Sequence, residues 1–205
     1  INWINDELLL IGVYKGDEYS ELAVFNPFIG SWHQELINAL PNRFNRGAIA
    51  ISPDLTRVLY VAGSEEQLSL VLWDLTDQRE LWRRDNYAGA LSSSHSPVLV
   101  DWTRDSSIVA FSDLESGKWQ IKLETLDRTG NQLQAVRPDA PYDSVNSMSW
   151  SPDGRFLAFI LAFADDQPGK LQIRLMVYDR IAHQSVEMCS LNDDDRPTHN
   201  IETNR

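Results

Sequence analysis

The chain has 205 residues and a single cysteine, Cys189. One cysteine excludes an intrachain disulfide. A catalytic thiol would need an activating neighbour, and the nearest histidine in sequence is His183. We therefore expect Cys189 to be a buried structural thiol. The sequence also lacks an apolar run of the length that a membrane-spanning helix needs, about 20 residues.

Basic residues are scarce. Eighteen Lys and Arg stand against 30 Asp and Glu, which gives a net charge of −12 at pH 7. This charge is spread evenly along the chain and forms no acidic tail. A broad negative field disfavours nucleic acid and anionic membranes as partners. The ordinary interpretation is a solvated surface that keeps the protein soluble.

Signatures of catalysis are missing as well. The chain has no Gly-x-Ser-x-Gly elbow, no His-Glu-x-x-His, no phosphate-binding Walker loop and no Gly-x-Gly-x-x-Gly. The four histidines fall at unrelated positions, which indicates no metal cluster: His33, His95, His183 and His199. The sequence therefore implies no metal and no cofactor.

What the sequence does contain is a repeat of about 50 residues. Each copy places a large apolar residue three positions before an Asp, at Trp3–Asp6, Ile51–Asp54, Trp102–Asp105 and Trp150–Asp153. A second landmark, an apolar residue followed by Asp or Asn, recurs at Phe25–Asn26, Trp73–Asp74, Leu126–Asp127 and Tyr178–Asp179. Such a period is typical of units that must stack to bury their faces, such as propeller blades.

Each copy reads as strands. Apolar residues alternate at Leu68, Leu70 and Leu72, which predicts one packed face and one wetter face. A denser run at Val58–Ala62 predicts a strand buried on both faces. No segment shows sustained helical periodicity, and we interpret Gln34–Leu40, which precedes Pro41, as a strand end plus loop.

The turns that follow the first strands of the four copies differ in whether they contain a glycine. The fourth copy has Ser-Pro-Asp-Gly at 151–154, in which Gly154 accepts a positive φ. The second copy has Leu55 in place of this glycine, and the first and third copies, which have Glu7 and Ser106 there, keep only the Asp. Because a positive φ is costly for residues with a Cβ, we expect those turns to adopt another conformation.

Ser-Pro-Asp-Gly-Arg-Phe-Leu-Ala-Phe at 151–159 resembles the WD40-like repeat of TolB-type β-propellers, and residues 52–61 resemble it more loosely. As a repeat pattern, the resemblance covers the whole chain. It implies an all-β fold of four-stranded antiparallel blades around a channel. It further implies a bacterial protein that is often extracytoplasmic, in the periplasm or at the cell surface, and that acts by binding other proteins. The motif forms a structural turn, so it transfers no catalytic residue.

We expect one domain over 1–205, with units at about 1–46, 47–96, 97–144 and 145–191 and a polar tail at 192–205. Propellers have four to eight blades. Either four blades close into a ring, or the chain is part of a six- to eight-bladed ring, which we favour. An open arc would expose an apolar face at each end.

Binding residues are expected in the connections between units, because loops vary and carry function. Tyr and Arg anchor interfaces best. The candidates in these connections are Arg43, Phe44, Arg46, Tyr87, His95, Arg137 and Tyr142. In contrast, we expect Trp32, Trp82 and Trp119 to pack within the blades.

Asp101 is a separate candidate for the channel. It precedes Trp102 in the innermost strand, where the other copies have Asn2, Ala50 and Ser149. An acid there could serve glycosidase- or lyase-type chemistry. The alternative, which we favour, is a buried Asp satisfied by backbone donors. An acid–base pair would need a second convergent group, and the sequence identifies none.

The sequence therefore favours a non-catalytic protein-binding or sensing module within a larger protein. Three alternatives stay open. The first is an enzyme with its site at the channel mouth, and the second is a propeller gate beside a hydrolase domain. The third is a structural spacer. A small-molecule ligand is compatible with all of these classes.

Overall fold

The computed structural model describes residues 2–15, 18–40, 49–64, 67–87, 99–115, 118–125, 132–136, 144–164 and 171–191. These residues form sixteen strands in four antiparallel sheets, and in every sheet the strands pair in chain order. We call the sheets blades 1 to 4. The all-β class and the four-stranded blades predicted from the sequence are confirmed.

The strand boundaries follow the repeat. Blade 1 comprises β1 (Asn2–Trp3), β2 (Leu9–Lys15), β3 (Glu18–Asn26) and β4 (Ser31–Trp32). Blade 2 comprises β5 (Ile49–Ile51), β6 (Arg57–Ser64), β7 (Gln67–Asp74) and β8 (Arg79–Arg84). Blade 3 comprises β9 (Val100–Trp102), β10 (Ile108–Glu115), β11 (Lys118–Thr125) and β12 (Gln132–Val136). Blade 4 comprises β13 (Ser144–Trp150), β14 (Phe156–Ala164), β15 (Leu171–Asp179) and β16 (Gln184–Leu191).

One short helix, α1 (Gln34–Ala39), follows β4 and lies beside β3. Our interpretation of this segment as a strand end plus loop was therefore wrong. Leu36, Ile37 and Leu40 all pack against one core cluster. An alternating strand would point Leu36 and Ile37 to opposite faces, whereas a helical turn brings all three to one side.

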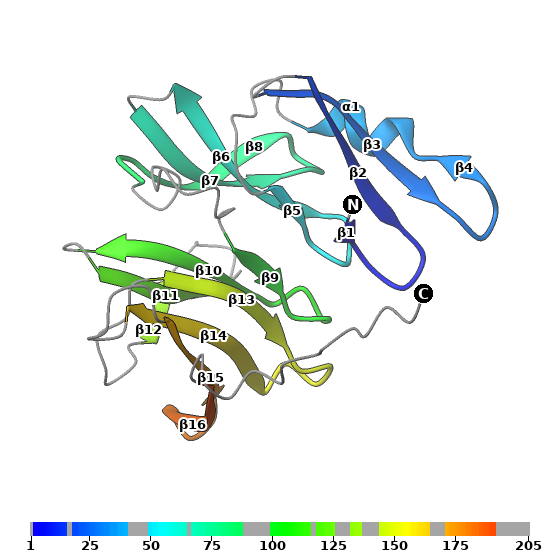
Figure 1. Ribbon diagram of the computed structural model, residues 1–205. Coiled ribbons are helices and arrows are strands. Elements are labelled where there is room, and N and C mark those ends of the chain that lie inside the picture. The colour runs from blue at the N-terminus through cyan, green and yellow to red at the C-terminus, as the bar shows by residue number, and fades with distance from the viewer. Residues whose placement is uncertain are drawn as a thin grey trace, which may run out of the picture.

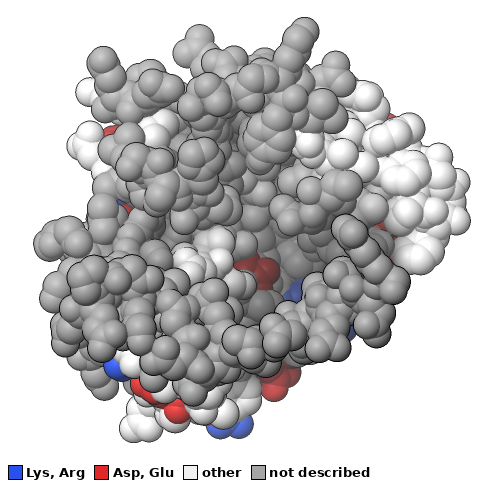
Figure 2. Space-filling view, viewed as in Figure 1, with Lys and Arg blue, Asp and Glu red and all other residues white. Residues whose placement is uncertain are grey.

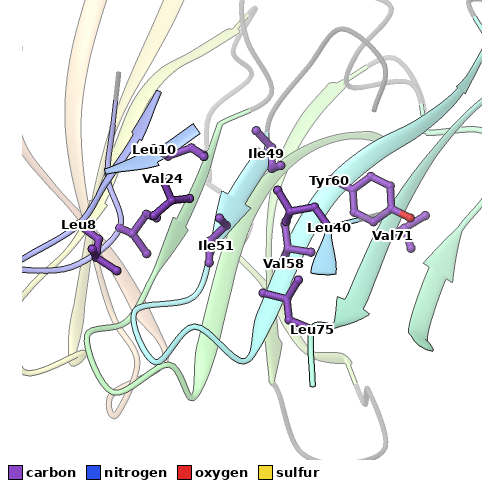
Figure 3. Close-up of a cluster of buried hydrophobic side chains, with 11 residues drawn as sticks. Leu8, Leu10, Val24, Leu40, Ile49, Ile51, Val58, Tyr60, Val71 and Leu75 are labelled. Atoms are coloured by element: carbon purple, nitrogen blue, oxygen red, sulfur yellow. The ribbon is translucent and has the colours of Figure 1, made fainter. Parts of the chain in front are cut away.

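The blades follow one another in an arc (Figure 1). The first strand of each blade lies on the inner side of this arc, since β9 contacts both β5 and β13. A buried apolar cluster fills the space between each pair of consecutive blades. Between blades 1 and 2, Leu10 and Val24 face Ile51 and Val58 (Figure 3). Two similar clusters lie between blades 2 and 3 and between blades 3 and 4.

Burial along the strands reflects this stacking. In blade 2, the β6 segment 58–61 is buried on both faces, as predicted. The neighbouring β7 is buried on both faces too, so the wetter face that we expected there does not exist: Ser69 and Val71 are buried. In blade 4, by contrast, β14 alternates between half-buried and buried residues over positions 156–161. An inner blade is thus covered on both faces, and an end blade on one.

The turns that follow the first strands repeat one hydrogen-bond scheme in blades 2, 3 and 4. In blade 2, the Ser52 hydroxyl donates to Asp54 Oδ1 at 2.6 Å and accepts from the Arg57 N–H at 3.0 Å. Thr103 in blade 3 and Ser151 in blade 4 make the equivalent bonds.

Our expectation that the turns without glycine adopt another conformation was wrong for blades 2 and 3, whereas Glu7 in blade 1 is not among the described residues with a positive φ. Leu55, Ser106 and Gly154 have φ values of 62°, 59° and 67°. Packing and hydrogen bonding offset the strain at the two residues that carry a Cβ. Leu55 packs against the cluster between blades 1 and 2, and the Ser106 hydroxyl accepts a hydrogen bond from the Asp54 N–H at 2.9 Å.

Gly154 touches the neighbouring blade, and this gives a test of blade stacking. A Cβ at Gly154 would lie 3.2 Å from Thr103 Cγ2, whereas a Cβ at Gly30, with a similar φ of +68°, would meet nothing. Thr103 is buried, and its hydroxyl is held by the turn. We expect Gly30→Ala to cost about 1 kcal/mol and Gly154→Ala about 2 kcal/mol of unfolding free energy in urea titrations. Equal losses would contradict the close contact between blades 3 and 4.

Candidate functional site

The inner side of the arc carries Asp101, the channel candidate. Asp101 lies on β9 opposite Ala110, one residue before Trp102. Its Oδ2 atom accepts a hydrogen bond from the Trp150 backbone N–H at 2.7 Å. The Ser149 hydroxyl and the Trp102 N–H also donate to this carboxylate. The side chain therefore joins the innermost strand of blade 3 to that of blade 4.

Burial raises the pKa of Asp101, because a low-dielectric environment disfavours the charged form. The hydrogen bonds from Trp150, Ser149 and Trp102 act in the opposite direction but do not cancel this effect. These three donors are two backbone N–H groups and a hydroxyl, and none of them titrates near neutral pH. Chemically, the arrangement provides one carboxyl with a raised pKa, which also joins two strand edges through its hydrogen bonds.

Similar polar bonds fasten the other blades. The Trp102 indole N–H donates to the Ala50 carbonyl at 3.1 Å, which links blade 3 to blade 2. The Asn5 amide donates to the Pro53 carbonyl at 3.0 Å, which links blade 1 to blade 2. The inner rim is thus a chain of hydrogen bonds that runs from blade to blade.

One ion pair joins two blades that are not consecutive. Arg104, in the turn of blade 3, pairs with Asp6, in the turn of blade 1. In Figure 2 the middle of the molecule is hollowed, and acidic and basic atoms lie inside the hollow. The described residues contain no group of three or more His, Cys, Asp or Glu that could hold a metal ion. No helix among them is long and apolar enough to cross a membrane.

Tyr87 is the only residue of our predicted binding set within the described part of the chain. It is fully buried in the cluster between blades 2 and 3, and its hydroxyl donates to the Ser112 carbonyl. We therefore withdraw Tyr87 as a surface contact: its ring fills an interblade space instead. Near it, Arg84 forms an ion pair at 3.1 Å with Asp113, which is fully buried.

The sequence did not indicate the pairing of Arg84 with Asp113. The only available signal was an acid next to the dense apolar run of β10, because a buried acid requires a partner. The six other members of the binding set lie outside the described residues: Arg43, Phe44, Arg46, His95, Arg137 and Tyr142.

One further expectation was wrong. Cys189 is exposed on β16 and is not a buried thiol. Trp32 packs within its blade as predicted, because its ring lies 4.6 Å from that of Phe25 between centroids, although the residue is 60% exposed. Trp82 does pack between blades, 6.1 Å from Phe111, as predicted. The side chain of Trp119 lies outside the described residues.

No protein-family model matches the chain, and no curated protein sequence is significantly similar to it. Solved structures do match. TolB from Acinetobacter baumannii aligns with a TM-score of 0.50 and 18% identity, over 88% of this chain and 40% of that one. A putative TolB from Agrobacterium tumefaciens aligns with a TM-score of 0.57 and 17% identity, over 90% of this chain and 61% of that one.

Hydrazine synthase from Kuenenia stuttgartiensis aligns with a TM-score of 0.54 and 11% identity, over 88% of this chain and half of that one. The chain thus spans 40% and 61% of the lengths of the two TolB structures. At these identities the similarity establishes the fold. The chain consists of TolB-like β-propeller blades, as the Ser-Pro-Asp-Gly repeat predicted.

The variant Asp101→Asn tests the role of this carboxyl through the pH dependence of the unfolding free energy. The pKa of Asp101 is raised in the folded state above its ordinary value of 3.8. The stability that this shift contributes is therefore present in full below that value and is lost as pH rises through the folded pKa. We expect wild type to lose unfolding free energy relative to Asp101→Asn as pH rises from about 3 to 7 in urea titrations. A relative gain with rising pH would contradict the burial of this carboxyl.

Tyr87→Phe tests whether Tyr87 stabilises the fold. Removing its hydroxyl leaves the buried Ser112 carbonyl without this donor, so we expect a loss of about 1 to 2 kcal/mol in unfolding free energy. Tyr178→Phe is the matched control. The Tyr178 hydroxyl makes a longer, partly buried contact of 3.3 Å with His183 Nδ1, and we expect a smaller loss. If chemical denaturation showed equal losses of unfolding free energy for the two variants, the Tyr87 hydroxyl would not stabilise the fold more than the Tyr178 hydroxyl does.

Proposed function

We propose that the chain is a non-catalytic protein-binding module that forms one segment of a six- to eight-bladed propeller. The observation that supports this proposal most is the inner rim. The carboxyl of Asp101 accepts a hydrogen bond from the innermost strand of blade 4, and the Trp102 indole donates one to blade 2 on the other side. Groups occupied in this way hold the blades together, so we assign partner contact to the loops.

The contact residues that we propose are those in the connections between blades. Each connection joins the outermost strand of one blade to the first strand of the next, as β8 is joined to β9. In an antiparallel blade these strand ends lie at the rim opposite the Asp-containing turns. The residues carried by these connections include three arginines and two aromatic side chains, which are frequent interface anchors: Arg43, Phe44, Arg46, His95, Arg137 and Tyr142.

The main rival is an enzyme with its site at the channel mouth. The raised pKa of Asp101 supports it, because an upward shift brings a carboxyl closer to the range in which it can act as a general acid. Glycosidase- or lyase-type chemistry would use such a group. We place this second because the described partners of Asp101 include no second acid or base.

The resemblance of residues 151–159 to the TolB-type repeat also supports an extracytoplasmic location, in the periplasm or at the cell surface, and we include that location in the proposal.

The proposal is tested by reversing charge in the connections between blades. A partner retained by the immobilised chain is purified and titrated against the triple variant Arg43→Glu, Arg46→Glu and Arg137→Glu. We expect its dissociation constant to rise at least about tenfold, because arginine anchors dominate interfaces. The matched control makes the same charge change at the opposite rim, with Arg79→Glu, Arg104→Glu and Arg155→Glu, and should bind as wild type does.

Two results would overturn the proposal. One is equal weakening by both triple variants, which would indicate a nonspecific charge effect. The other is turnover of a carbohydrate or peptide that Asp101→Asn abolishes, which would establish the rival enzyme.

A further inference from the structure

Blade 3 departs from the repeat within its second strand, β10. Ser112 and Asp113 stand three and four positions after Val109, which pairs with Trp102. The equivalent positions of the other blades are apolar or glycine: Gly12 and Val13, Val61 and Ala62, and Ile160 and Leu161. Ser112 and Asp113 are both almost fully buried. Since a buried polar side chain is costly unless it is bonded, both residues need partners.

The chain leaves blade 2 through β8 and enters the connection to blade 3 with two side chains already bound. Arg84, the last residue of β8, forms an ion pair at 3.1 Å with the fully buried Asp113 of blade 3. Asp85 accepts a hydrogen bond at 2.8 Å from the Ser69 hydroxyl of β7 in blade 2. The start of the connection is therefore attached to both blades.

Tyr87 attaches the connection again, two residues further on. Its backbone N–H donates to the Leu68 carbonyl of blade 2 at 2.8 Å, and its hydroxyl donates to the Ser112 carbonyl of blade 3. The ring between these two bonds is fully buried in the cluster between the two blades. A tyrosine that is buried and bonded at both ends has a fixed position. Tyr87 therefore marks the point at which the chain leaves the interblade core.

The end of the connection returns to the same residue of blade 3. Leu99 stands directly before β9, and its carbonyl accepts a hydrogen bond from the Ser112 N–H at 3.0 Å. In a regular antiparallel pair, the reciprocal bond joins the Leu99 N–H to the Ser112 carbonyl. In this blade the Leu99 N–H donates to the Ser112 hydroxyl instead, at 3.2 Å, and the Ser112 carbonyl accepts from the Tyr87 hydroxyl. Ser112 thus binds both ends of the connection.

The serine hydroxyl is what makes this arrangement possible. It gives the Leu99 N–H an acceptor of its own and leaves the Ser112 carbonyl to Tyr87. Val61 and Ile160, at the equivalent positions of blades 2 and 4, have no such group. Buried polar groups favour one arrangement, because any other leaves them without partners. Loops of about 6 to 16 residues whose ends meet, as the ends of residues 88–98 do, are frequently functional.

We propose that Tyr87 and Ser112 are positioning residues, which hold the connection between blades 2 and 3 in the placement that partner binding requires. This inference rests on the proposed function, which assigns partner contact to the connections between blades. Because Tyr87 is buried, it acts through the residues that it holds and does not touch the partner. A connection that is already in place before the partner arrives lowers the entropy that binding costs.

A spin label tests this placement without any partner. In a Cys189→Ser background, Ser93→Cys provides the single cysteine to which a nitroxide is attached within the connection. The clamp variant, Tyr87→Phe with Ser112→Ala, removes the two hydroxyls that bind the ends of the connection. We expect the nitroxide spectrum to narrow in the clamp variant, because release of the ends lets the label move more freely.

The matched control variant, Tyr178→Phe with Ser151→Ala, makes the same two chemical changes in blade 4. The Tyr178 hydroxyl contacts His183, and the Ser151 hydroxyl accepts from the Phe156 N–H at 2.9 Å. We expect the label in this control to give the same spectrum as in the parent. Circular dichroism checks that both variants fold. If the clamp variant does not fold, Ser112→Ala alone is compared with Ser151→Ala.

Titration of the purified partner against the unlabelled variants completes the test. We expect its dissociation constant to rise about fivefold or more for the clamp variant and to stay at the wild-type value for the control. An unchanged nitroxide spectrum in the clamp variant overturns the inference, whether or not the proposed function stands. Wild-type binding by the clamp variant, where the arginine triple variant of the connections binds weakly, overturns this inference alone. Failure of the proposed function is distinct, because that triple variant then binds as wild type does.

Discussion

Each blade of this protein has apolar side chains on both faces, and the fold depends on a neighbouring blade to cover each face. The three buried clusters lie between consecutive blades, and no other cluster is found among the described residues. Consequently the central strand of blade 2, β6, is buried on both faces, whereas that of blade 4, β14, is buried on one. Stability in such an array comes from nearest-neighbour interfaces. Each of the two end blades has only one such interface, so it gains less stability than an inner blade.

Polar groups supplement this packing where the sheets come closest together. The innermost strands are edge strands, and an unpaired edge leaves backbone N–H groups that need acceptors. The Asp101 carboxylate accepts from the Trp150 backbone N–H. In addition, the Ala50 carbonyl accepts from the Trp102 indole N–H. These groups lie where a channel site would be expected, yet their bonds run from blade to blade. This is why we assign function to the connecting loops rather than to the channel.

Much of the fold follows from spacing alone, because the recurrence of Trp3, Ile51, Trp102 and Trp150 fixes the register of four similar units. The errors arise where burial by a distant segment overrides local preference. Leu55 adopts a positive φ because it packs against the preceding blade. Tyr87 lies in a connection but is buried between blades, and Cys189 lies in a strand but is exposed. None of these outcomes is encoded within a few residues of the position concerned. The candidate site was predicted less well than the fold, because Tyr87, its one member among the described residues, is buried between blades.

Native-state hydrogen exchange of dilute protein tests the central claim most directly, because it measures the opening free energy of each strand separately. If interblade packing determines stability, the amides of β6 and β10 in blades 2 and 3 exchange slowest, and those of β2 and β14 in the end blades exchange faster. Uniform protection across the four blades, or slowest exchange in blade 1 or blade 4, would contradict this account.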